Sequence, residues 1–91
     1  RSPQMKVVQE NAGELMKKAF MDLLSIFVEY AGEDALALVL GHSYFLQKDD
    51  AKTPGQLKVN LAPLLEEYLA QGYVAGFAEP VRAYLQWIES L

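Results

Sequence analysis

The sequence contains no cysteine and only one histidine, His42. Without cysteine the chain has no disulfide framework, no thiolate nucleophile and no zinc site built on sulfur. His42 has no second histidine or cysteine near it, so neither a histidine metal site nor a Ser-His-Asp arrangement is supported. The serine and threonine residues lack a nucleophile-elbow context. We therefore expect a structural or surface role for His42, no catalytic residues and no enzymatic activity.

Sequence patterns that hold metals or cofactors are also missing. Residues 49–55 lack the alternating oxygen ligands of a calcium loop, and Val39 stands where a bundle-type Glu-x-x-His motif would need its glutamate. Adjacent acidic residues point about 100° apart on a helix and do not converge on one ligand. Three acidic pairs are of this kind: Glu33-Asp34, Asp49-Asp50 and Glu66-Glu67. We expect neither a metal ion nor a cofactor.

Clustered positive charge and long apolar runs are scarce as well. Twelve acidic residues outnumber eight scattered basic ones, and the net charge of −4 argues against binding to nucleic acid. The longest nearly uncharged stretch, 35–47, is far shorter than the roughly 20 residues of a membrane span. No secretory segment is evident, and the cytoplasm is the expected compartment. Because Arg1 replaces an initial methionine, we also expect a fragment or added N-terminal residues.

What the sequence has in abundance is apolar surface for a small helical fold. Of its 91 residues, 52% are hydrophobic, a proportion typical of a folded protein. The length predicts one domain, 1–91, in which residues 1–10 are alternatively an extended or partner-bound arm. A chain of this size buries only about two thirds of its unfolded surface, so help from a partner subunit is plausible.

A long first helix is predicted over residues 4–31. Its apolar residues fall within an arc of about 120° at 100° per residue. Beyond residue 19, a second stripe (Met21, Leu24 and Val28) predicts that this half of the helix is largely buried. A start at Asn11 is the alternative, with Gly13 as a kink and residues 1–10 separate. The main stripe comprises Met5, Val8, Ala12, Leu15, Met16, Ala19, Leu23, Ile26, Phe27 and Tyr30.

Three shorter helices are predicted after the first. Residues 34–47 have almost no polar face, which is typical of a central helix surrounded by others. A helical turn beginning with a Thr53 cap leads to a helix over 60–71; the strand-like alternation of residues 56–61 has no partner strand. The last helix spans 79–91. The expected fold is all-α, a small four-helix bundle-like domain with a long first helix and a central apolar second helix.

The unequal helix lengths carry the functional prediction. At 1.5 Å per residue the first helix is about 40 Å long and the others are about 20 Å. Its N-terminal end must fold back, lie unpaired or pack on another chain, and an isologous homodimer with these ends crossing or exchanged is the economical solution. We expect a non-catalytic protein–protein interaction or oligomerisation module. Its predicted interface residues are Met5, Val8, Ala12, Leu15, Met16, Tyr84, Trp87 and Leu91.

The aromatic residues suggest an alternative function. Trp87 lies about 80° from the centre of the apolar face of its helix, next to Tyr84, and such boundary rings often anchor protein interfaces. The same rings could instead line a pocket for an apolar small ligand or lipid, because helical bundles host such ligands between helices. No motif in the sequence is specific enough to carry a resemblance to a known family.

Overall fold

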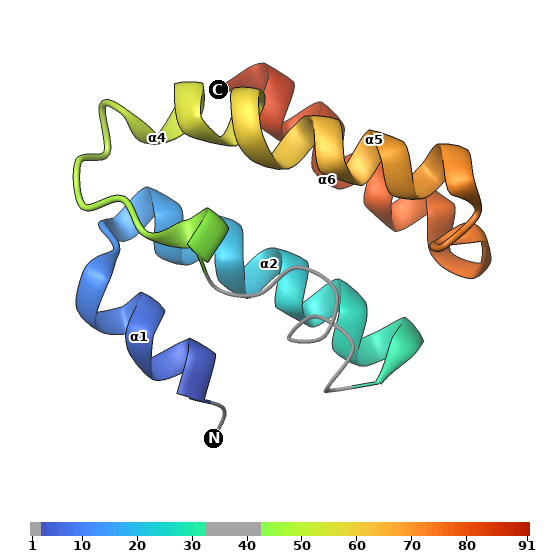
Figure 1. The fold of residues 1–91 in the computed structure, drawn as a ribbon, viewed down its shortest axis with the longest axis horizontal. Helices are drawn as coiled ribbons and strands as arrows, with labels where there is room; N and C mark the ends of the chain where they lie inside the picture. The colour runs from blue at the N-terminus through green and yellow to red at the C-terminus, as the bar shows by residue number, and fades with distance from the viewer. Residues whose placement is uncertain (1–2, 33–42) are drawn as a thin grey trace. The chain divides into compact units, whose positions relative to one another are not determined.

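The structure, a computed structural model, describes residues 3–32 and 43–91 (Figure 1). These residues form helices, turns and loops, and none of them is in a strand, which confirms the all-α fold class. The chain divides into two compact units, residues 1–53 and 54–91, each described by itself. The predicted single domain stays a prediction.

The first unit begins with two helices where one was predicted. Two residues separate the helix α1 (Pro3–Asn11) from α2 (Glu14–Ala31), and Figure 1 shows the sharp turn between the two helices. The continuous helix over 4–31 is therefore wrong, because Gly13 adopts an extended conformation with φ −76° and ψ −179°. The break lies where Gly13 predicted a kink, and α1 folds back to contact α2.

The core of the first unit follows the predicted main stripe. An edge-to-face pair of rings, Phe20 and Phe45, lies at its centre with 5.0 Å between ring centroids. Phe45 belongs to a short 3-10 turn, η1 (Ser43–Phe45), which contacts α2. The buried apolar residues of this unit are Val8, Ala12, Met16, Ala19, Phe20, Leu23, Phe27 and Phe45.

The predicted central helix over 34–47 is described only at its end. Residues 34–42, including His42, lie outside the described residues. The 3-10 turn ends at Phe45, and residues 46–49 have no regular secondary structure, so the predicted helix ran too far. The backbone carbonyl of Gln47 accepts a hydrogen bond from the amide of Gly13, 2.9 Å away, so this segment bonds to the junction between α1 and α2.

The second unit opens with a helix that widens into a π turn. The segments α4 (Thr53–Gln56), η2 (Leu57–Leu61) and α5 (Ala62–Gln71) follow one another without a break. Within η2 the amide of Ala62 donates to the carbonyl of Leu57, five residues back. The predicted start near residue 60 is therefore too late, and the strand-like alternation is helical.

Pro63 explains the π turn. In a regular α-helix its ring would clash with the carbonyl of Val59, and it has no amide to donate to that carbonyl. A wider turn relieves this clash without ending the helix. Leu57 and Leu61 are buried and Val59 is 73% exposed, so the apolar face continues through the turn into Leu65.

The end of α5 is a Schellman motif. Gly72 adopts the left-handed conformation at φ 81°, and its amide donates to the carbonyl of Leu69. The amide of Tyr73 donates to the carbonyl of Tyr68, 3.0 Å away, and the two rings meet edge to face with centroids 5.6 Å apart. Tyr73 keeps this contact although it is 70% exposed, and the end of α5 at Gln71 confirms the predicted helix end.

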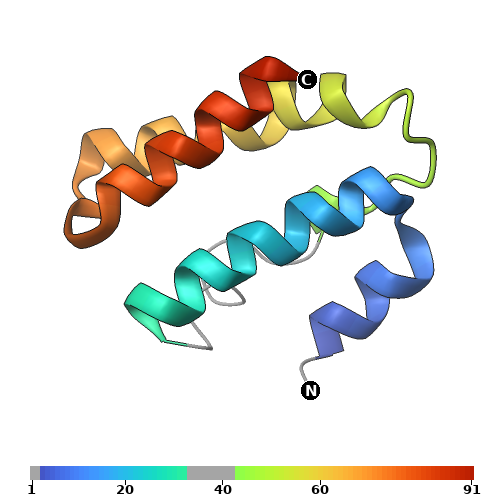
Figure 2. The ribbon, with the colours of Figure 1, turned by 180° about the vertical axis from the view of Figure 1, so that it is seen from behind.

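The last helix packs against the earlier part of this unit. After a 3-10 turn, η3 (Ala75–Phe77), α6 (Ala78–Ser90) begins one residue before the predicted start and runs beside α5, as Figures 1 and 2 both show. It also contacts η2. The buried apolar residues of the second unit are Leu57, Leu61, Ala62, Leu65, Val74, Phe77, Val81, Tyr84 and Ile88.

Gly72→Ala should destabilise the second unit by about 1 kcal/mol, because a Cβ disfavours the left-handed backbone that this position adopts. Gly55→Ala is the matched control: Gly55 lies in α4 with open space around its Cβ position and no positive φ. The control should stabilise the chain by about 0.5–1 kcal/mol. Urea denaturation followed by circular dichroism measures both, and equal effects of the two substitutions would contradict the αL assignment.

Candidate functional site

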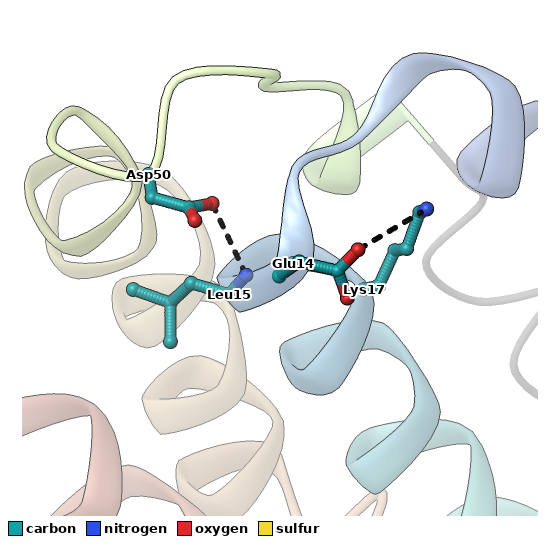
Figure 3. Close-up of polar contacts among 4 residues, drawn as sticks. All are labelled: Glu14, Leu15, Lys17 and Asp50. Carbon is teal, nitrogen blue, oxygen red and sulfur yellow. Dashed lines mark hydrogen bonds and ion pairs between the residues drawn. The ribbon is translucent and has the colours of Figure 1, made fainter.

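The junction between α1 and α2 is built from residues far apart in sequence. Gly13 occupies the N-cap position of α2 and has no side chain to accept a hydrogen bond from the helix start. Asp50 supplies the acceptor instead: the amide of Leu15 donates to Asp50 Oδ1 at 3.1 Å (Figure 3). A carboxylate at this end of a helix is also favoured by the helix dipole. The junction thus takes its cap from a residue 35 positions later.

Gly13 fits this junction because it has no Cβ. The amide of Gly13 donates to the carbonyl of Gln47, and its carbonyl accepts from the amide of Lys17, both at 2.9 Å. A Cβ added at Gly13 would lie 2.6 Å from the backbone carbonyl oxygen of Lys48 and would collide with the Asp50 carboxylate. Any larger residue therefore requires the loop to move.

The loop that carries Asp50 is ordered by its own hydrogen bonds. Gln47 Oε1 accepts from the amide of Asp49 at 3.0 Å, and Asp49 Oδ1 accepts from the amide of Ala51 at 2.9 Å. The carbonyl of Asp49 accepts from the amide of Lys52 and from the buried hydroxyl of Thr53. These bonds fix the position of Asp50 at the helix start. Within the adjacent acidic pair 49–50, Asp50 caps α2 and Asp49 accepts hydrogen bonds within the loop.

The predicted interface stripe at the chain's beginning is largely used within the chain itself. Val8 is 1% exposed, and Ala12 and Met16 are also buried, whereas Met5 and Leu15 are partly exposed. Of the three outcomes expected for this end of the helix, the described conformation has the fold-back, because the break at Gly13 lets α1 fold onto α2. The role of these residues in an interface stays a prediction.

The three predicted interface residues of α6 lie in the second unit. Tyr84 is buried, and Trp87 and Leu91 are half-buried. The rings of Tyr84 and Trp87 contact each other, with centroids 5.6 Å apart and planes inclined by 44°. Trp87 therefore lies at the boundary that its helical position predicted, and each of these rings has the other as a neighbour.

A second apolar surface, whose exposure the sequence did not predict, runs along α2. Met21 and Val28 are 42% and 45% exposed, and Leu24 between them is half-buried. We call these three residues the α2 stripe. The sequence pattern showed this stripe but predicted that it is largely buried. The error arose because helical periodicity groups residues on one face without showing whether another element covers that face.

Polar groups border the α2 stripe at both ends of the helix. Lys18 pairs with Asp22 at 2.8 Å, and Lys17 lies 3.8 Å from Glu14. Near the C-terminal end, the negative charge of Glu29 and the hydrogen bond that its carboxylate accepts from the Tyr30 hydroxyl raise the pKa of the Tyr30 phenol above its ordinary value of 10.0. Two ion pairs thus lie in the first half of α2, and an acidic group lies near its end.

Metal-binding and membrane-spanning features were searched for in the described ranges, 3–32 and 43–91. Those ranges contain no group of three or more carboxylate or imidazole side chains that could hold a metal ion. No helix within them combines the length and apolar character needed to cross a bilayer. Comparison with known proteins finds no matching family model, no similar curated protein and no similar solved structure.

Asp50→Ala should destabilise the first unit by about 1 kcal/mol, because the amide of Leu15 loses its acceptor. Asp50→Asn should cost less, because the amide oxygen can still accept this bond and only the favourable interaction of the charge with the helix dipole is lost. Thermal unfolding at equal protein concentration compares the two variants with the wild type. An alanine variant as stable as the wild type would contradict the capping role.

Proposed function

We propose that this chain is a non-catalytic protein–protein interaction module that forms a homodimer through the α2 stripe. The observation that carries the proposal is the exposure of Met21 and Val28 on one helix face. These residues are seven positions apart, which is close to two helical turns, and Leu24 lies between them on the same side. Apolar side chains at this spacing are typical of surfaces that meet another helix.

The size of the stripe indicates a weak and reversible pairing. Full burial of one large apolar side chain contributes about 1.5–3 kcal/mol, and the stripe residues already have half or more of their surface covered. Association also costs free energy, because translational and rotational freedom is lost. This cost offsets much of the free energy that burial of six such side chains from two copies contributes. The dimer should therefore form in a concentration-dependent way.

An antiparallel arrangement of the two α2 helices fits the residues that border the stripe. If the helices cross between Leu24 and Ser25, Met21 of one copy lies opposite Val28 of the second copy. The same crossing directs Lys17 toward the end of the second helix that carries Glu29. Such an interface is isologous, as most homodimers are. As before, we expect the pairing to occur in the cytoplasm.

The other predicted surfaces have less support in this conformation. The Met5–Met16 stripe is mostly buried, and the contribution of Trp87 and Leu91 to an interface stays a prediction. The alternative function, an aromatic-lined pocket for an apolar ligand, also stays a prediction. Its candidate rings in the second unit pair with each other, as Tyr84 and Trp87 do.

Met21→Glu should abolish dimer formation while the chain stays folded, because the new charge would be buried without a partner in the interface. Val59→Glu is the matched control, since Val59 is an exposed valine of the second unit, outside α2. Light scattering over a range of protein concentrations measures the molar mass. The wild type and the control should approach twice the monomer mass, and Met21→Glu should remain at the monomer mass.

Two outcomes would contradict this proposal. One is a wild-type mass that stays monomeric at millimolar concentration. The other is a dimer that Met21→Glu leaves unchanged, which would place the contact on another surface. Far-ultraviolet circular dichroism of each variant verifies that a change in mass does not come from unfolding.

A further inference from the structure

The apolar residues of α1 and α2 keep one helical phase across the break that separates them. Val8, Ala12 and Met16 are buried and each is four residues from the next, and the spacing continues on α2. Residues spaced in this way share a face only within a single uninterrupted helix. Because the bent chain does not need this common phase, the pattern points to a second conformation in which residues 3–31 form one helix.

The break itself is short and contains little that opposes a helix. It consists of Ala12, the residue type with the best helix propensity, and Gly13, whose propensity is lower by about 1 kcal/mol. No proline lies within the span from Gln4 to Ala31. The bent form is therefore held by contacts of the junction rather than by the local sequence.

Those contacts could be exchanged for helical ones at nearly equal numbers of hydrogen bonds. In the bent form the amide of Gly13 donates to Gln47, and the amide of Leu15 donates to Asp50. In a continuous helix the same two amides would donate to the carbonyls of Gln9 and Asn11, four residues back. Few hydrogen bonds are lost on straightening, so the difference in free energy between the two forms depends mainly on where α1 packs.

We propose that the junction is a hinge through which two copies of this chain exchange α1. Straightening at Gly13 removes α1 from its own α2 and exposes Val8 and Ala12, and the α1 of a second copy can fill the vacated place with the same contacts. Such an exchange changes only the hinge conformation, which makes it a low-cost route to a dimer. The occupant is a second copy of this chain, because the vacated surface is the one that an identical α1 covers in the bent form. Exchange is independent of pairing through the α2 stripe.

Two substitutions drive the hinge in opposite directions. Gly13→Ala favours a helix and places a Cβ 2.6 Å from the carbonyl oxygen of Lys48, so it disfavours the bent form. Glu14→Pro favours the bent form. Position 14 is the first of α2, where proline is well tolerated, and the extended Gly13 suits a residue before proline. In a continuous helix the same proline would clash with the carbonyl of Glu10.

Asp50→Ala supplies a gentler opening of the hinge that adds no clash. It removes the cap of α2 only from the bent form. The equilibrium constant between the bent and the straight form therefore shifts about fivefold toward the straight form in each chain. The dimerisation constant should therefore rise about 25-fold when both chains carry the substitution. Adding Glu14→Pro to Asp50→Ala should return the chain to a monomer.

The experiment measures molar mass by light scattering and helix content by circular dichroism, with every variant made in the Met21→Glu background to remove pairing through α2. Gly13→Ala and Asp50→Ala should form dimers with more helix per chain, and the variants that also carry Glu14→Pro should not. If Gly13→Ala does not fold, Asp50→Ala decides. A folded, monomeric Asp50→Ala chain at millimolar concentration, or a dimer that persists with Glu14→Pro, would overturn the proposal. Loss of the Met21-dependent dimer alone would refute only pairing through α2.

Discussion

The start of α2 depends on one hydrogen-bond acceptor that its own N-cap residue cannot supply. Gly13 permits the close approach of the loop, and Asp50 at the end of that loop accepts from the amide of Leu15. This contact region lies at the turn where α1 folds back onto α2, and the loop that supplies the cap is ordered by its own hydrogen bonds. The first unit is therefore organised around a cap formed over a separation of 35 residues.

The helical phases of this chain could be predicted because they are local properties. The buried face of α6 and the main stripe of α2 follow directly from the spacing of their apolar residues. The glycine at position 13 indicated where the helix breaks. The sequence did not indicate that the break is stable, because the capping carboxylate belongs to a distant residue. The uncovered state of Met21 and Val28 also depends on which elements pack where, and helical spacing alone does not contain that information.

The predicted turn and restart before Pro63 were replaced by a continuous helix with a π turn. Sequence rules treat a proline as the end or the first turn of a helix, and here an alternation of apolar and polar residues added a strand-like signal. The structure keeps the helix and changes its width instead, since Leu57 and Leu61 remain on the buried face. This outcome depends on packing against α6, which a reading of residues 56–63 cannot include.

The π turn has a consequence for how the length of this protein can change in evolution. A π turn holds one more residue than the α-helical turn it replaces, so it corresponds to a one-residue insertion that the rest of the helix absorbs. Deleting that residue would restore regular α-helical geometry and bring back the clash between the ring at position 63 and the carbonyl four residues earlier. In related chains the extra residue of η2 and the proline at position 63 are therefore expected to be gained or lost together.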